Sequence, residues 1–387
     1  MLKLPAPEGR LEPYRIGGRA LSPRAPRVAL SRTAFAAAHV VSDPLAERNP
    51  WVGRPAVDWD NTLRFRHWLW DQGLGLAEAM DTAQRGMGVD WQTARELIER
   101  TMAEARAHPM RPRVACGAGT DHRPAERLDS AAAIEAAYAE QMEAIEAAGG
   151  QIIVMASRAF PAMGAKPETY ARVYARLLDQ AARPVILHWL GHMFDPALKG
   201  YWGTQDVAAA SEVVLGIIAE NPGKVDGIKV SLLDRAHEEA LRSRLPGGVR
   251  LYTGDDFNYA DLIAGDGNHH SHALLGIFAA IAPAASRALE ALARDDMAAY
   301  RELLAPTVPL SREIFREPTR FYKAGIAFLA WLNGIQSHFI MPAGFQSARD
   351  ITHYSVVFRL ADRAGLLYRP DLAEARMKLL LKLHGIG

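Results

Sequence analysis

The stretch KVDGIKVSLLD, residues 224–234, places a lysine in the middle of a short apolar strand. Side chains alternate between the two faces of a strand. Lys229 therefore shares one face with Gly227 and Ser231, while Ile228 and Val230 share the other. An ammonium group is costly to bury unless it is paired or loses its proton. The pattern is typical of a barrel strand whose small and polar side, including Lys229, points inward.

Seven further apolar runs resemble this strand, and amphipathic helical stretches separate them. The eight runs are RVAL (27–30), LGLAEAM (74–80), PRVACGAG (112–119), GQIIVMAS (150–157), PVILHWL (184–190), VDGIKV (225–230), VRLYTG (249–254) and HSHALLG (270–276). Strands that alternate with helices favour a parallel sheet, and eight strands close a barrel of about 250 residues. The sequence therefore predicts an α/β fold, a (β/α)8 TIM barrel with an added C-terminal helical layer.

We expect three segments: an N-terminal extension (1–26), the barrel (27–290) and a helical region packed on it (291–387). Residues 42–56 contain three prolines and no periodicity, which predicts an irregular loop after the first strand. The apolar run AGIAFLAWLNG (324–334) predicts core or an oligomer face, with core as the default. An open doubly wound sheet is the competing architecture, but the GAG turn at 117–119 lacks the third glycine of a dinucleotide site.

Composition excludes several classes of function. The 387 residues carry 45 basic and 44 acidic side chains, a net charge of +1, so neither nucleic acid nor an anionic membrane is an expected partner. The single cysteine, Cys116, rules out an internal disulfide framework and is typical of a reducing compartment. No apolar run has the length of a signal peptide or a membrane span. These features predict a cytoplasmic protein.

The carboxyl ends of the strands form the active-site face of such a barrel. A lysine buried there loses its proton more easily, and its amine can form a Schiff base with a carbonyl substrate. The alternative is a lysine that reaches solvent or pairs with Asp226 or Asp255. Position alone favours neither interpretation.

Other polar residues follow the strands and complete a candidate site. His188 titrates near neutrality and is the first candidate to move protons, although it could instead form a hydrogen bond within the rim. Ser157 with Arg158 is the second candidate, and Arg158 could equally form an ion pair with a nearby acid. The expected substrate-binding residues are Asp81, Thr82, His192, Asp255 and His270. One of Asp255 and Asp256 is expected to serve the turn instead.

Several motifs, in order and at barrel spacing, resemble the dihydrodipicolinate synthase/N-acetylneuraminate lyase family. They are residues 57–84, RVACGAGTD (113–121), PVILHWLGHM (184–193), VDGIKVSLLD (225–234) and YTGDD (252–256). The resemblance implies that Lys229 forms the Schiff base and that the chain associates as a dimer or tetramer. It points to a divergent, uncharacterised synthase-like branch.

The chain departs from this family at two places. Asp81 replaces one residue of the family's threonine pair, and MASRAFP (155–161) holds no counterpart of the tyrosine that moves protons. A carboxylate at Asp81 would repel a substrate carboxylate, so a pyruvate site of the standard type is not expected.

The sequence thus predicts a class I lyase, an aldolase-type enzyme or dehydratase that acts on a keto acid or keto sugar in carbohydrate or related catabolism. Its expected partner is a small-molecule carbonyl substrate, with no cofactor and no metal. Two alternatives stay open. The His- and Asp-rich rim, including His269 and His272, could hold the metal of a sugar isomerase or lyase. The barrel could also bind a sugar without chemistry.

Overall fold

The computed structural model describes residues 2–46 and 54–386, and its centre is a closed barrel of eight parallel strands. The strands are β3 (Ala34–Ala37), β4 (Gly75–Glu78), β5 (Val114–Ala118), β6 (Gln151–Val154), β7 (Val185–Leu190), β8 (Val225–Ser231), β9 (Arg250–Thr253) and β10 (His272–Leu275). Each strand pairs with the next along the chain, and β10 pairs with β3 to close the ring. The predicted (β/α)8 barrel is confirmed.

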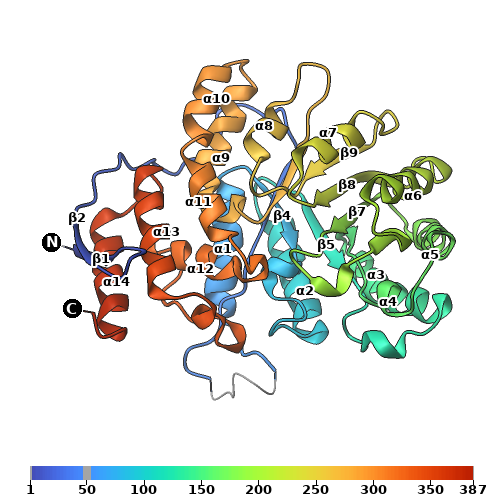
Figure 1. Cartoon of the computed structure of the whole chain (residues 1–387), viewed down its shortest axis with the longest axis horizontal. Helices are drawn as coiled ribbons and strands as arrows, with labels where there is room; N and C mark the ends of the chain where they lie inside the picture. Colours follow the sequence, from blue (N-terminus) through green and yellow to red (C-terminus); the bar gives the residue numbers. More distant parts are fainter. Residues whose placement is uncertain (1, 47–53, 387) are drawn as a thin grey trace.

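Helices follow the strands and cover the outside of the barrel (Figure 1). They are α1 (Trp59–Asp71), α2 (Trp91–Ala107), α3 (Ala131–Ala148), α5 (Pro167–Gln180), α6 (Val207–Glu220), α7 (Arg235–Arg242), α8 (Tyr259–Ala264) and α9 (Phe278–Leu292), with the short α4 (Ala159–Ala162) before α5. Local sequence sets their ends. The Ser130 side chain accepts a hydrogen bond from the amide of Ala133 at the start of α3, and Gly149 ends that helix in the left-handed region.

The first strand of the barrel is not RVAL (27–30) but the alanine-rich stretch Ala34–Ala37. Val28 is 37% exposed, and residues 27–30 lie outside the strands. Alanine has a low strand propensity. Here its small side chains are buried on both faces, and tertiary packing overrides the propensity. The irregular loop predicted for 42–56 begins after this strand, and residues 47–53 lie outside the described part of the chain.

The chain after α9 forms a helical layer beside the barrel (Figure 1). Its helices are α10 (Met297–Leu304), α11 (Thr307–Ile314), α12 (Lys323–Leu332), α13 (Ile351–Arg363) and α14 (Pro370–Leu383). Every residue of α12 is buried, so the core interpretation of the apolar run 324–334 is confirmed. The exact division at residues 290 and 291 stays a prediction.

The N-terminal hairpin packs against this helical layer, and both termini lie at the same side of the molecule in Figure 1. Its strands β1 (Leu2–Pro5) and β2 (Leu11–Tyr14) pair antiparallel. The Tyr14 hydroxyl donates to the Asp362 carboxylate over 2.7 Å, and the amide of Gly18 donates to the same group over 2.9 Å. Arg359 donates to the carbonyl of Leu4. These contacts anchor the first residues of the chain to α13.

Candidate active site at the carboxyl ends of the barrel strands

Lys229 lies on β8 and faces the interior of the barrel. It is paired with His188 on β7 and with Tyr252 on β9. Tyr252 belongs to the cluster of side chains that fills the barrel, and paired residues of a parallel sheet share a face. The missing side chain of Gly254 makes room for the lysine, since a Cβ atom there would lie 2.8 Å from Lys229 Cε. The inward direction predicted from strand alternation is confirmed.

The environment of Lys229 makes its amine easier to deprotonate than that of a lysine in water. Its side chain is 5% exposed, and burial lowers its pKa, while the carboxylates of Asp81 and Asp256 oppose this change. The side chain of Lys229 makes no hydrogen bond and no ion pair within residues 2–46 and 54–386. The predicted alternative of an ion pair with Asp226 or Asp255 is therefore wrong. Asp226 pairs instead with Arg250, over 2.5 Å.

His188 is the side chain beside Lys229 on the neighbouring strand. Its Nε2 lies 3.3 Å from Ser231 Oγ, and its Nδ1 has no partner in the described part of the chain. Burial, together with the charge of Lys229, holds the pKa of His188 well below its usual range, although Asp81 opposes this. A neutral imidazole with a free nitrogen can accept a proton from a bound molecule.

Asp81 and Thr82 follow β4 in a short 3-10 helix (Asp81–Ala83), and a tyrosine from the C-terminal layer joins them. The Tyr322 hydroxyl donates to the Asp81 carboxylate over 2.7 Å and lies 2.5 Å from Thr82 Oγ1. Burial and the negative charge of Asp81 hold the pKa of Tyr322 well above its ordinary value, so the phenol keeps its proton. The sequence shows no tyrosine after the fourth barrel strand, and the fold supplies one from a segment far along the chain.

Lys323 is a second buried lysine close to the same carboxylate. Burial lowers its pKa to about 8, and Asp81 opposes that change. Its Nζ donates to the carbonyl of Arg320 over 2.9 Å and lies 4.6 Å from the centre of the Tyr322 ring. Burial alone would raise the pKa of Asp81, but the charges of Lys323 and Lys229 and the hydrogen bond from Tyr322 lower it overall. Asp81 is therefore an ionised carboxylate among basic groups.

Ser157 and Arg158 follow β6 and line the mouth of the barrel. Ser157 Oγ lies 2.6 Å from Thr120 Oγ1, and the Ser157 amide donates to the Tyr201 hydroxyl over 3.2 Å. Arg158 forms an ion pair with Asp195 over 2.5 Å. The sequence allowed this ion pair as the alternative to substrate binding. The Arg158 guanidinium is thus already paired, whereas the Ser157 hydroxyl lies against the cavity described below.

Three of the expected binding residues do not fit that role. His192 is exposed on the loop after β7 and does not line the mouth cavity. Asp255 accepts hydrogen bonds within its own turn, from the amides of Phe257 and Asn258. Asp256 also accepts one, from the amide of Ile277, but it is the member of the pair whose charge acts on Lys229. His270 precedes β10 and therefore lies at the opposite, amino-terminal end of the barrel. The expected run 270–276 itself begins with His270, so the prediction is wrong because it takes the start of this strand for its carboxyl end.

The two ends of the barrel separate the histidines of the metal alternative. His269 and His272 lie at the amino end of β10, while His188 is inside the barrel near the other end. Glu78 faces outward and binds the Arg66 guanidinium through both carboxylate oxygens. Across the described ranges, no three His, Cys, Asp or Glu side chains are arranged to hold a metal ion. The structure therefore does not favour the metal-dependent alternative.

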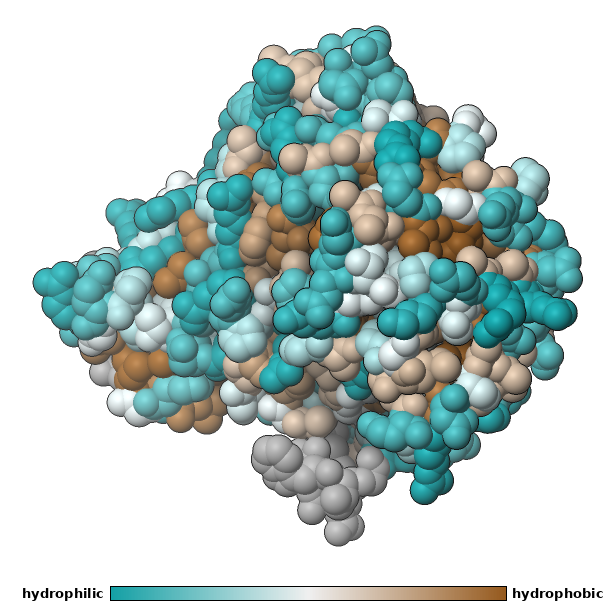
Figure 2. All heavy atoms as spheres, turned by 45° about the vertical axis from the view of Figure 1, so that its right-hand side comes forward, coloured by the Kyte–Doolittle hydropathy of each residue, from teal (hydrophilic) through white to brown (hydrophobic). Residues whose placement is uncertain are grey.

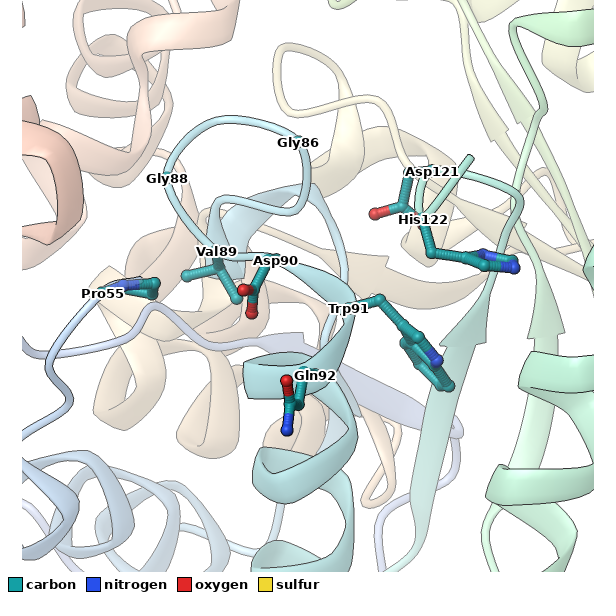
Figure 3. Close-up of a pocket in the computed structure, with 9 residues that line it drawn as sticks. All are labelled: Pro55, Gly86, Gly88, Val89, Asp90, Trp91, Gln92, Asp121 and His122. Atoms are coloured by element: carbon teal, nitrogen blue, oxygen red, sulfur yellow. The ribbon is translucent and has the colours of Figure 1, made fainter. Parts of the chain in front are cut away.

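A cavity of about 680 Å³ opens above these residues, and its walls include Asp81, Ser157, Arg158 and His188. Lys229 is not in its lining, but its strand partner His188 is. A second cavity of about 550 Å³ adjoins it and shares Gly86 and Asp121 with it (Figure 3). The rings of Trp91 and His122 lie side by side there, 6.3 Å apart.

The fold belongs to a class known from solved structures. Dihydrodipicolinate synthase from Aquifex aeolicus has 12% sequence identity and a TM-score of 0.60, with 92% of this chain and 98% of that chain covered. A second structure is YagE, a prophage protein of E. coli K12 from the dihydrodipicolinic acid synthase family, solved in complex with pyruvate. It has 14% identity and a TM-score of 0.62, with 93% of this chain and 100% of that chain covered. The synthase from Bacillus clausii has 14% identity and a TM-score of 0.62, covering 85% and 97%. The resemblance inferred from the motifs is confirmed at the level of the fold.

The chain itself belongs to the family described as "Protein of unknown function (DUF993)", whose model matches residues 2–386. No curated protein matches the chain. None of the helices in the described ranges is both long and apolar enough to cross a membrane.

Two residues of the site, Tyr322 and Lys323, are not among those expected from the sequence. Asp256 is expected there only as the alternative to Asp255. The pair Tyr322-Lys323 directly precedes the apolar run of α12. Lys323 at the start of an apolar helix resembles Lys229 within an apolar strand, because both amines lose their hydration.

Proposed function

We propose that this protein is a Schiff-base-forming lyase, an aldolase-type enzyme or dehydratase that acts on a small carbonyl substrate, either a keto acid or a keto sugar. The observation that carries the proposal is the state of Lys229. It is a buried amine inside the barrel, its pKa is lowered, and no group in the described chain occupies it through a hydrogen bond or ion pair. Such an amine attacks a carbonyl carbon.

The proposed reaction begins when Lys229 Nζ adds to the carbonyl carbon and forms a carbinolamine. Loss of water then gives an iminium ion, and the oxygen of the carbonyl leaves in that water. The positive iminium accepts the electron pair of a neighbouring C–C or C–H bond and becomes an enamine. The reaction therefore needs one group that removes a proton from the substrate and one group that donates a proton to it. Neutral His188 can accept one, and the Tyr322 hydroxyl can donate one.

Tyr322 supports the proposal because it supplies the group that the chain otherwise lacks. Its hydroxyl contacts both Asp81 and Thr82, and Asp81 lines the mouth cavity. The ionised Asp81 accepts a hydrogen bond from Tyr322 and so fixes the position of its hydroxyl, and Tyr322 recovers its proton from the substrate or water in a later step. The same negative charge disfavours a substrate carboxylate next to it. We therefore place the polyhydroxylated part of a keto sugar, or the end of a keto acid remote from its carboxylate, near Asp81.

Reductive trapping tests the proposal. The protein is incubated with candidate keto acids and keto sugars, reduced with borohydride, digested and mapped by mass spectrometry. We expect an adduct on Lys229 in the wild type and none at that position in Lys229→Ala. Lys323→Ala is the matched control, since Lys323 is also buried with a lowered pKa and should leave the Lys229 adduct in place. An adduct on Lys323 alone, or turnover that persists in Lys229→Ala, would contradict the proposal.

Two expectations from the sequence belong to the same proposal, namely a cytoplasmic location and association as a dimer or tetramer. Light scattering after size exclusion measures the second directly. A stoichiometric metal after purification, with activity lost to a chelator, would favour the metal-dependent alternative. Tight sugar binding without turnover or adduct would favour a binding protein.

A further inference from the structure

A separate cavity of about 420 Å³ lies at the amino-terminal end of the barrel, opposite the site of Lys229. It lies between residues 26–35, the residues before β4 and the residues before β5. All strands of the barrel are parallel, so their amino ends share one face. This face also holds the histidines that precede β10, which the proposed function does not use.

The charges around this cavity have one sign. Arg32, Arg111 and Arg113 line it, and no Asp or Glu is among its lining residues. The guanidinium groups of Arg111 and Arg113 make no hydrogen bond or ion pair within the described ranges. Arg32 uses only Nε, which donates to the carbonyl of Ile263 over 3.2 Å, so its two terminal nitrogens stay available. In a chain of net charge +1, three arginines with no acid in the same cavity lining are a local excess of positive charge.

Two histidines, His270 and His272, lie beside the cavity at the same end of the barrel. Burial and the charges of His270, Arg250, Arg32 and Arg113 lower the pKa of His272 to about 3, so its ring is neutral. The amide of Thr33 donates to His272 Nδ1 over 2.9 Å, which leaves Nε2 to carry the hydrogen. Three acids near this face are already paired, namely Asp226 with Arg250, Asp266 with Arg242 and Asp71 with His108.

The walls of the cavity are apolar below the arginines. Phe35, Trp70 and Leu74 are buried beneath it. Val28 and Met110 stay 37% and 49% exposed at its edge, and both are among the few large apolar side chains left open to solvent in the described chain. Figure 2 shows one face of the molecule, where polar side chains cover most of the surface and apolar atoms appear mainly in hollows between them. An apolar wall below a cationic rim suits a ligand with both characters.

We propose that this cavity binds a small organic anion, a phosphate or carboxylate group carried on an apolar body. The guanidinium groups of Arg111 and Arg113 hold the anionic group, since arginine matches both oxyanions in a two-pronged geometry. The apolar body lies against Val28, Met110 and Phe35. The site is independent of the chemistry at Lys229, and its test needs no knowledge of the substrate.

Isothermal titration calorimetry of the full chain with four probes tests this site. The probes are phenyl phosphate, benzoate, inorganic phosphate and benzyl alcohol. We expect saturable one-to-one binding of phenyl phosphate or benzoate, at least tenfold weaker binding of inorganic phosphate, and none of benzyl alcohol. Stronger binding of phenyl phosphate than of benzoate identifies phosphate as the recognised group, and the reverse order identifies carboxylate. Affinity should fall as salt is added, because the contact is ionic.

Variants locate the binding. Arg113→Gln removes an exposed, unpaired charge, and the variant should fold normally. It should weaken binding of the anion about tenfold, as expected for the loss of a hydrogen bond to a charged group. Arg172→Gln, on exposed α5, removes the same charge at a place that does not line the cavity and should leave affinity unchanged. Met110→Ser should weaken phenyl phosphate but not inorganic phosphate. No saturable binding by either aromatic anion, or equal affinity in wild type and Arg113→Gln, would overturn the proposal.

Discussion

Lys229 and His188 occupy paired positions on β8 and β7, so a lysine amine and a neutral imidazole share the inside of one barrel. Each affects the other, because the charge on Lys229 helps to keep His188 unprotonated. The pair brings a nucleophile and a proton acceptor within one strand spacing. Several consequences can be measured.

Gly254→Ala is expected to disturb Lys229 directly. The new Cβ atom would lie 2.8 Å from Lys229 Cε and even closer to Ser231 Oγ, so the lysine must move. Overpacking of this kind costs about 1–3 kcal/mol in the free energy of unfolding, and borohydride trapping at Lys229 should fall with it. Gly216→Ala on α6 is the control, since no atom lies within 4 Å of its added Cβ. That change should stabilise the protein by up to about 1 kcal/mol. Equal trapping in Gly254→Ala and wild type would contradict the close packing around the lysine.

Tyr322→Phe removes the hydroxyl that joins Asp81 and Thr82. Loss of the bond to a buried carboxylate should cost about 1–3 kcal/mol in stability. If Tyr322 carries the proton, turnover should fall about 10²–10⁴-fold while trapping of the imine persists. Tyr368→Phe is the matched control, because its buried hydroxyl has no partner in the described chain. Turnover and trapping that fall in parallel would show a merely structural role for Tyr322.

Asp81→Asn should shift the pH dependence of trapping to lower pH. The Asp81 carboxylate raises the pKa of Lys229 more than any other charge does. The neutral amide side chain of the variant therefore leaves a larger fraction of Lys229 as the free amine at a given pH. Its oxygen can still accept a hydrogen bond from Tyr322. Trapping rates from pH 5 to 9 measure the shift, and Asp206→Asn at the exposed start of α6 is the control. A curve that does not move would mean that Asp81 is not ionised beside Lys229.

Lys323 should make the folded protein less stable at neutral pH than at alkaline pH. Unfolded lysine keeps its proton up to about pH 10.5, whereas the folded pKa is about 8. Between these values the unfolded state binds more protons, so stability rises with pH. The full difference is about 3 kcal/mol at about 1.4 kcal/mol per pKa unit. Urea unfolding at pH 7, 8, 9 and 10 measures it.

Lys323→Met should lose most of this rise and be more stable than wild type at pH 7. Lys199→Met, which changes an exposed lysine without a hydrogen bond or ion pair in the described ranges, should keep the wild-type slope. Parallel slopes in wild type and Lys323→Met would show that the folded state keeps Lys323 charged.

Much of the barrel could be predicted from the sequence because strand and helix patterns are local. Seven of the eight expected runs overlap observed strands. The miss at Ala34–Ala37 arose because alanine carries no strand signal of its own, and only closure against β10 and β4 makes this stretch a strand. The error at His270 arose because a strand's start and end look alike in an apolar pattern. Which end a residue occupies decides which face of the barrel it joins.

The sequence by itself determined the barrel architecture and the inward direction of Lys229, since alternation along one strand needs no information from elsewhere. The tertiary structure decided what surrounds that lysine. Tyr322 and Lys323 arrive from a helix that follows the barrel, and no local pattern relates them to Asp81. It also decided that Asp256, not Asp255, acts on Lys229, because only the fold shows which of two adjacent carboxylates is directed toward the lysine and which toward its own turn. Charges interact through space, and the spacing along the chain does not report their distances.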